Sequence, residues 1–274
     1  LEPLNFKAVK LDLEKKGLIN KANDFLMASG KLAALLYKEE IERAMKTVGI
    51  SGYQLLDLHD FPGQGTALVG LLNAFWENKG IVDASFFRQF CSPIVLLANF
   101  SKAVYCNNEK LEGTVQVANY GEYPLTDAHI LCELEFPESG LVLTQKESIS
   151  RIDIGMNMLP MNFQFDLSDI DKATKAVLRL KIAGTDFHNE WNVWVYPSNQ
   201  SVDFQDIVFT GDFNIVQKAL QDGKKVLFNP DCQQLKGLEG KFVPVFWSPV
   251  HFTDQAGTMG LLLDSKHPVF AHFP

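Results

Sequence analysis

The chain has 274 residues, of which 46% are hydrophobic and 21% charged, a composition that is ordinary for a globular protein of one to three domains. The formal net charge is −8 and the basic residues are scattered, which argues against a nucleic-acid-binding surface. The longest apolar runs, such as residues 94–98, are far shorter than the roughly 20 residues that cross a bilayer, so no membrane segment is expected.

Helical periodicity dominates the first part of the chain. Apolar residues at three- and four-residue steps predict a helix over residues 5–16 and a longer one over residues 21–46. The apolar positions of the longer helix are Phe25, Leu32, Leu35, Leu36, Ile41 and Met45. Pairs at i and i+4, such as Lys38 with Glu42, are interpreted as support for its solvent face, worth about a few tenths of a kcal/mol each.

Residues 52–80, GYQLLDLHDFPGQGTALVGLLNAFWENKG, are the most distinctive stretch. Tyr53 to Leu58 are predicted to form a buried strand, and the apolar run from Leu68 to Trp76 predicts a helix. Between them lies a polar, turn-rich corner. In parallel α/β architectures the loop that leaves the carboxyl end of a strand is where ligands are held. The candidate substrate-binding residues are therefore His59, Asp60 and Gln64.

The same corner also has a structural interpretation, in which Asp60 caps the following helix or orients His59. Other chemistry is not indicated. The six histidines lack zinc-binding spacing, and the segment around Gln64 lacks the Lys-Ser/Thr of a phosphate loop, so no metal and no cofactor are predicted. The four cysteines have no CxxC spacing and are interpreted as reduced, packed thiols.

The string LLDLHDFPGQGTALVG at residues 55–70, with DFLMASGKL at residues 24–32, resembles the end of the catalytic barrel in β-galactosidase-like bacterial enzymes of glycoside hydrolase family 2. The resemblance implies that residues 1–92 are the C-terminal part of a (β/α)₈ barrel. It also implies that both catalytic glutamates lie before Leu1, so that this chain contains no catalytic residue. The complete enzyme would act on a carbohydrate, and the family suggests a bacterial periplasmic or extracellular location.

From about Ile94 the period changes from 3.6 to 2. Alternating runs at residues 111–118, 128–136, 161–167, 176–182 and 191–196, with turn signals between them, predict a two-sheet immunoglobulin-like β-sandwich over residues 93–198. The indole rings of Trp191, Trp194 and Trp247 could serve as carbohydrate platforms, although core packing is the favoured alternative. Trp191 and Trp194 have opposite parity on one strand, so one is expected in the core and the other on the outer face or under a neighbouring domain.

A composition shift near Pro197 indicates a linker. Beyond it, a strand at residues 207–210, a turn or N-cap at Gly211-Asp212, a helix at 214–220 and a strand at 224–228 predict the start of a βαβ unit. This unit would open a partial α/β domain over residues 205–274. The expected fold class is therefore multi-domain α and β: a helical barrel remnant, a sandwich and a partial α/β module.

Two function classes are open. The chain could be a fragment of a glycoside hydrolase that cleaves β-linked, galactoside-like carbohydrates and is itself inactive, or a non-catalytic carbohydrate-binding or scaffolding module. Saturable oligosaccharide binding without hydrolysis, blocked by replacing a tryptophan, would favour the second. In the first case, the strand at residues 53–58 and the barrel-facing sides of the helices would be exposed, and a homo-oligomer is expected because pairing two copies hides that surface.

Overall fold

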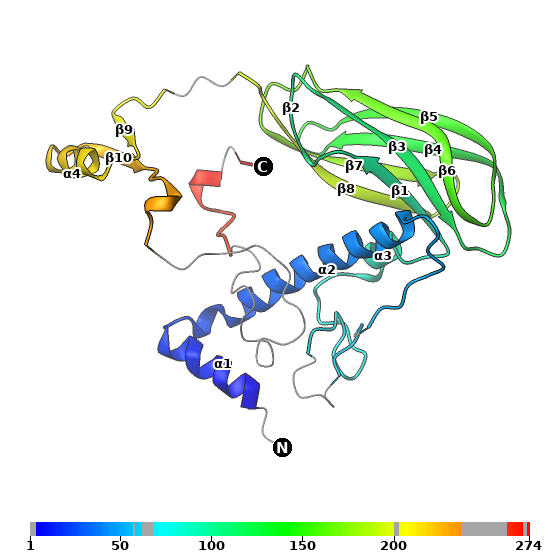
Figure 1. The fold of residues 1–274 in the computed structure, drawn as a ribbon, viewed down its shortest axis with the longest axis horizontal. Helices are drawn as coiled ribbons and strands as arrows, with labels where there is room; N and C mark the ends of the chain where they lie inside the picture. Colours follow the sequence, from blue (N-terminus) through cyan, green and yellow to red (C-terminus); the bar gives the residue numbers. More distant parts are fainter. Residues whose placement is uncertain (1–3, 57, 62–67, 200–202, 237–261, 271–272) are drawn as a thin grey trace. The chain divides into compact units, whose positions relative to one another are not determined.

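The computed structural model describes residues 4–56, 58–61, 68–199, 203–236, 262–270 and 273–274 (Figure 1). The chain divides into two compact units, one of residues 1–198 with 242–274 and one of residues 199–241. It is a mixed α and β protein rich in strand, as predicted. No helix in the described part of the chain is long and apolar enough to span a membrane.

The two predicted N-terminal helices are present. Helix α1 spans Leu4–Lys15, the 3₁₀ turn η1 spans Ile19–Lys21, and α2 spans Ala22–Lys46. Helix α1 ends at Lys15, and Gly17, two residues later, has a φ of 68°, a left-handed conformation that glycine adopts without steric cost. The short helix α3, Ala84–Arg88, begins at Asp83, whose carboxylate accepts a hydrogen bond from the Phe86 N–H.

The predicted strand at residues 53–58 and the helix after it are not formed in the described residues. The described part of residues 51–80 has only isolated bridges, which join Leu72 to His59 and to Asn78. A single strand there would have no parallel neighbour for its backbone groups, and Leu56 is 78% exposed. The described residues therefore show no strand–helix unit of a barrel.

A tight turn replaces the predicted helix around Trp76. The Asn73 side-chain oxygen accepts hydrogen bonds from the backbone N–H groups of Phe75 (2.9 Å) and Glu77 (3.0 Å). Asparagine often competes with helix formation in this way, by binding nearby backbone groups. The φ of Trp76 is +65°, which is incompatible with a right-handed helix and strained for a bulky side chain. Helical spacing of apolar residues was therefore a misleading signal here.

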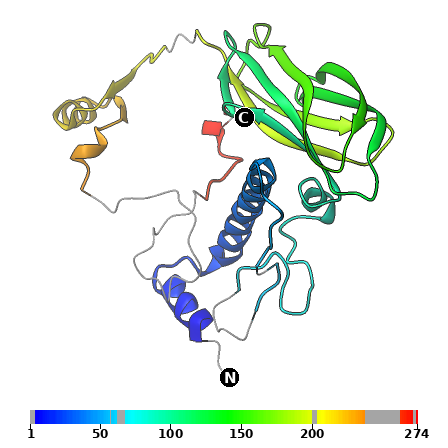
Figure 2. The same ribbon diagram turned by 45° about the vertical axis from the view of Figure 1, so that its right-hand side comes forward.

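Two sheets form the predicted β-sandwich (Figures 1 and 2). Its strands are β1 (Ile94–Phe100), β2 (Val104–Cys106), β3 (Lys110–Asn119), β4 (Leu125–Phe136), β5 (Leu141–Ile152), β6 (Gly155–Asp166), β7 (Thr174–Ile182) and β8 (His188–Tyr196). One sheet has the order β1-β3-β6 and the other β2-β8-β7-β4-β5. All pairs are antiparallel except β2 with β8.

Alternation places apolar side chains of both sheets in one shared core. Phe136 of β4 and Phe163 of β6 are among the largest fully buried side chains, and burying one such side chain contributes roughly 1.5–3 kcal/mol. Strand β1 differs because residues 94–98 are all buried. Ile94, Leu96 and Ala98 belong to the sandwich core. The alternate residues of β1 pack in a second apolar cluster with Ile41 and Met45 of α2, Phe90 and Ala118.

The smaller unit contains the predicted βαβ arrangement. Strand β9 (Ile207–Thr210), helix α4 (Phe213–Gln221) and strand β10 (Lys225–Phe228) follow one another, and the two strands are parallel. Two 3₁₀ turns, η3 (Cys232–Gln234) and, in the larger unit, η4 (Pro268–Phe270), complete the described elements. All four cysteines are free, as predicted, but Cys106 and Cys232 are exposed rather than packed.

Candidate functional site

The predicted corner around residue 60 is organised by one buried carboxylate. Asp60 is 6% exposed, and its Oδ1 accepts hydrogen bonds from the Gly70 N–H (3.0 Å) and from Lys79 Nζ (2.7 Å). Lys79 also donates to the Gly70 carbonyl at 2.8 Å. A Cβ on Gly70 would lie 2.5–2.6 Å from backbone atoms of His59 and Asp60, so the two segments meet where only glycine fits. Asp60 therefore ties two loop segments together.

His59 lies next to this ion pair, half-buried. Its Nδ1 is 2.7 Å from the Asp60 carbonyl oxygen, and its ring packs against Trp76 in a tilted arrangement, with the centroids 4.2 Å apart and the planes at 40°. Gln64 lies outside the described residues. The structure thus brings His59 and Asp60 together with Lys79 and Trp76. The Asp60 carboxylate caps no helix in the described residues, and His59 contacts the backbone carbonyl of Asp60 rather than its carboxylate. Sugar binding by these residues stays a prediction.

A second charged pair lies where the sequence predicted solvent. Lys38 and Glu42 of α2 are 6% and 2% exposed, so the interpretation of this pair as support for a solvent face is wrong. The buried face of α2 contains Ala34, Lys38, Ile41, Glu42 and Met45. Two charged residues lie on this face because α2 packs against the sandwich, which supplies polar partners from a distant part of the sequence.

Those partners are Asn189 and Trp191 of β8. Lys38 Nζ donates to Glu42 Oε1 and to Asn189 Oδ1. The carboxylate of Glu42 also accepts from Asn189 Nδ2 at 2.8 Å and from Trp191 Nε1 at 2.9 Å. The second Asn189 N–H binds the Leu96 carbonyl at 2.8 Å. We call Lys38, Glu42, Asn189 and Trp191 the buried network.

The buried network is built for structure rather than for reaction. Burial lowers the pKa of Lys38, while Glu42 opposes this shift by stabilising the ammonium. The ammonium also lies over the rings of Trp191 (4.9 Å to the centroid) and Phe90 (5.6 Å). Two of the three ammonium donors of Lys38 are thus bound within the protein. Breaking such a pair is costly, since one charge would remain buried alone.

A cleft of about 630 Å³ opens beside the buried network. We call it the α2 cleft, and its lining includes Lys38 and Glu42 of α2, Gln89 after α3, and Trp191, Asn192 and Trp194 of β8. As predicted from parity, the two indoles differ in environment: Trp191 packs against the sandwich core, and Trp194 is outside that core. Trp194 Nε1 donates to the Pro274 carbonyl at 3.1 Å. Trp247 lies outside the described residues.

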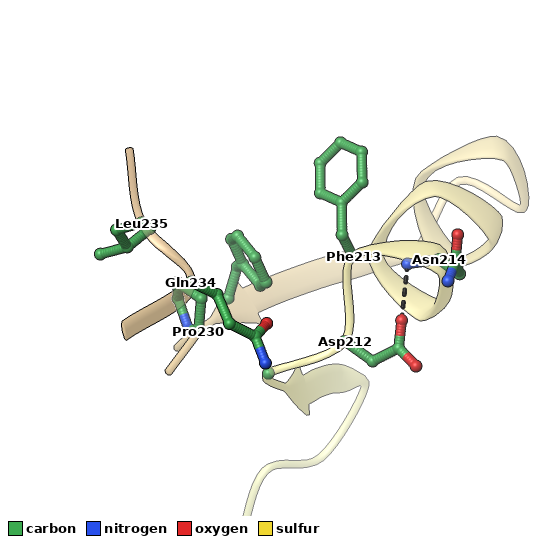
Figure 3. A pocket seen from close by; sticks show the side chains of 8 residues that line it. Asp212, Phe213, Asn214, Pro230, Gln234 and Leu235 are labelled. Carbon is green, nitrogen blue, oxygen red and sulfur yellow. Dashed lines mark hydrogen bonds between the residues drawn. The ribbon is translucent and has the colours of Figure 1, made fainter. Parts of the chain in front are cut away.

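A separate cavity of about 550 Å³ lies in the smaller unit, at the carboxyl ends of β9 and β10. Figure 3 shows its lining residues, which come from the turn before α4 and the first residues of α4, and from the end of β10 and the segment after it. The Asp212 carboxylate accepts a hydrogen bond from the Asn214 N–H at 2.7 Å, so it serves as the helix N-cap. Residues 211–214 are exposed, and none of the polar residues that line this cavity is buried.

No group of three or more His, Cys, Asp and Glu residues within the described ranges could hold a metal ion. Sequence reasoning missed the buried network and the α2 cleft. A usable signal was present, because Ala34, Ile41 and Met45 define one face of α2 on which Lys38 also falls at helical spacing. The partners on β8 gave no such signal.

Comparison with known proteins identifies two domain models. Residues 109–197 match a domain of unknown function, DUF8488, and residues 208–274 match another domain of unknown function, DUF8487. No curated protein matches the chain. The sandwich strands β3 to β8 thus lie within the first match, and the βαβ unit lies within the second apart from its first residue.

Similar solved structures include the alkylpurine DNA glycosylase AlkC of Pseudomonas fluorescens, bound to DNA containing an abasic site analog (10% identity, 38% of this chain and 30% of that chain, TM-score 0.32). Another is the CARDB domain of the PF1109 protein of Pyrococcus furiosus in complex with di-metal ions (11% identity, 38% of this chain and 94% of that chain, TM-score 0.29). A third is the β-glucuronidase of Parabacteroides merdae (12% identity, 38% of this chain and 13% of that chain, TM-score 0.27). The chain thus spans less than a third of the glycosylase. Likenesses this weak carry no conclusion about function.

Proposed function

We propose that this chain is the C-terminal region of a β-galactosidase-like glycoside hydrolase of family 2, whose two catalytic glutamates belong to sequence before Leu1. The complete enzyme would cleave O-glycosidic bonds of β-linked, galactoside-like carbohydrates. Support comes from the resemblance of residues 24–32 and 55–70, and from the order of helical segment, β-sandwich and βαβ unit along the chain. The β4–β5 and β7–β8 hairpins in one sheet support an immunoglobulin-like topology for the sandwich.

The observation that carries the proposal is the exposure of large apolar side chains in the N-terminal segment. Leu4 and Leu11 of α1 are 69% and 64% exposed, and Leu56 and Phe75 are 78% and 82% exposed. Single exposed apolar residues are normal, but their accumulation in one segment indicates a surface that another part of a protein covers. In the proposed enzyme, the earlier strands and helices of the barrel cover this surface.

The carboxylates of the chain fit this proposal. A retaining glycosidase needs two carboxyl groups facing each other at about 5 Å, one of them protonated. Glu42 and Asp60, the buried carboxylates in the described part of the chain, are each paired with a lysine, Lys38 and Lys79. Carboxylates that are already bound by a lysine ammonium are not free to meet a glycosidic bond, as the two carboxyl groups of the catalytic pair must. These contacts support a catalytic pair elsewhere.

The test compares hydrolysis of aryl β-glycosides by the purified 274-residue chain and by the same chain extended upstream to the start of its reading frame. We expect turnover only from the extended protein. Turnover by the 274-residue chain would contradict the assignment of the glutamates to upstream sequence. An extended, folded protein that hydrolyses no aryl β-glycoside would contradict the proposal as a whole.

The second candidate is a non-catalytic carbohydrate-binding or scaffolding module. The buried network favours it, because a helix fastened to a sandwich by buried charged groups holds a fixed geometry, which a scaffold needs. In this case the extended protein would also lack hydrolytic activity, and the 274-residue chain would bind oligosaccharides saturably.

A further inference from the structure

We propose that the α2 cleft binds a neutral saccharide through groups that the fold leaves unengaged. The inference deepens the proposed function and rests on it for the source of the sugar, a β-linked carbohydrate. The volume of about 630 Å³ lies within the range of roughly 300–1,000 Å³ that small-molecule sites occupy. The charges, the aromatic surfaces and the free polar groups of the lining indicate the chemical class of the ligand.

The charges of the lining indicate an uncharged ligand. Three cations and three anions line the cleft: Lys38, Lys46, Lys102, Glu39, Glu42 and Glu190. Each has a partner within the protein. Lys38 pairs with Glu42, Lys102 with Glu109, Glu190 with Arg179 and Glu39 with Arg43, and Lys46 Nζ donates to the Ala98 carbonyl at 2.8 Å. With as many anions as cations in the described lining, the cleft has no excess charge that would favour a phosphate or carboxylate ligand.

The indoles supply apolar ring surfaces with their polar atoms already bonded. Trp191 donates its N–H to Glu42 and Trp194 donates its N–H to the Pro274 carbonyl. Trp191 is also held edge-to-face against Phe100, with the ring centroids 6.2 Å apart. The Lys38 ammonium already lies over the Trp191 ring, so the Trp194 ring is the one that suits the carbon–hydrogen face of a sugar, and a ring fixed by its hydrogen bond loses little conformational entropy on binding.

Three polar side chains of the lining remain for hydroxyl groups. Gln89 is 7% exposed, and its buried Oε1 has no hydrogen-bond partner in the described structure. Leaving such an acceptor unpaired is unfavourable, and rotation of its amide toward the cleft would let a ligand hydroxyl donate to it. Ser101 and Asn192 are exposed, and their side chains make no hydrogen bond within the described residues. A ligand with many hydroxyls and an apolar face matches this lining.

The experiment titrates the 274-residue chain with lactose and with an acidic disaccharide of the same size that carries a glucuronate, following tryptophan fluorescence and calorimetric heat. We expect saturable binding of lactose and at least about tenfold weaker binding of the acidic sugar. The test variants are Gln89→Leu and Asn192→Ala, each expected to weaken lactose binding by about tenfold, the usual effect of losing one hydrogen bond. The matched control is Gln116→Leu, because Gln116 Oε1 is also buried and unpartnered but lies outside the cleft.

Binding lost in Gln89→Leu or Asn192→Ala and kept in Gln116→Leu supports the proposal. If Gln89→Leu fails to fold, the exposed Asn192→Ala decides the matter alone. A folded chain that binds neither sugar, or that binds lactose unchanged in both test variants, overturns the proposal. None of these outcomes depends on hydrolysis, so the glycosidase proposal and the saccharide site can fail separately.

Discussion

Replacing Glu42 with glutamine should destabilise the chain much more than any surface charge change. The substitution preserves side-chain volume but removes the negative charge that Lys38, Asn189 and Trp191 all face. Lys38, 6% exposed, would then be a buried cation without a counter-charge. Removing one partner of a buried ion pair costs about 3–5 kcal/mol, which is a large part of the 5–15 kcal/mol that typically stabilises a domain.

The measurement is a urea titration at pH 7, followed by tryptophan fluorescence and circular dichroism. With a denaturant dependence of about 2 kcal/mol per molar urea, a loss of 3–5 kcal/mol moves the midpoint down by about 1.5–2.5 M. The control is Glu39→Gln on the same helix. Its partner Arg43 is 67% exposed and Glu39 itself 59%, so the expected loss is only about 0.3–0.5 kcal/mol.

A double variant, Lys38→Met with Glu42→Met, separates the buried charge from the packing. Exchanging a buried ion pair for apolar residues of similar size is often neutral or stabilising, so the double variant should recover most of the loss. The reasoning is refuted if Glu42→Gln unfolds within about 1 kcal/mol of the native chain, or if Glu39→Gln costs as much.

Four further outcomes are expected. Burial lowers the pKa of Lys38 in the folded chain below its usual 10.5, so between the folded and the unfolded pKa the unfolded chain binds more protons. The free energy of unfolding should therefore rise with pH between these two pKa values. Urea melts at a series of pH values should show this rise, and Lys38→Met should remove it. Gly113→Ala should lower the free energy of unfolding by about 3 kcal/mol in urea melts, because the added Cβ would lie 2.2 Å from the Asn99 carbonyl oxygen. The control Gly140→Ala has nothing within 4 Å of its Cβ and should lose only about 1 kcal/mol, from backbone strain alone. A thiol reagent should modify the exposed Cys106 and Cys232 rapidly, as followed by mass spectrometry. Cys132 should react only after unfolding, because burial raises its pKa to about 12. Rapid modification of Cys132 in the folded chain would contradict its burial. Sedimentation at micromolar concentration should show self-association through the apolar N-terminal surface, and a strictly monomeric chain that binds no hydrophobic dye would count against it.

The sandwich and the βαβ unit could be predicted because their signals are local. Alternation marked five of the eight sandwich strands, and the Gly211-Asp212 turn marked the start of α4. Strand β1 gave no alternation, since both of its faces are buried. Strand β5 was missed because it is an edge strand with mostly exposed residues, so it has few apolar residues to alternate.

The errors arose where distant residues decide the structure. Tyr53 to Leu58 have the composition of a strand, but the described residues offer no neighbouring strand for this segment. Lys38 and Glu42 have the spacing of a surface pair, and only Asn189 and Trp191, far along the chain, reverse that interpretation. The α2 cleft could not be predicted for the same reason, because its walls come from segments that meet only after folding.

The buried network also sets an order on folding. Glu42 and Asn189 are 147 residues apart in sequence, and Asn189 belongs to the last strand of the sandwich. At synthesis rates of about 5–20 residues per second, the ribosome makes β8 roughly 7–30 seconds after α2. During that interval Lys38 and Glu42 remain hydrated and the apolar residues of α2 lack their docking surface. Attachment of α2 to the sandwich is therefore expected to be a late step of folding.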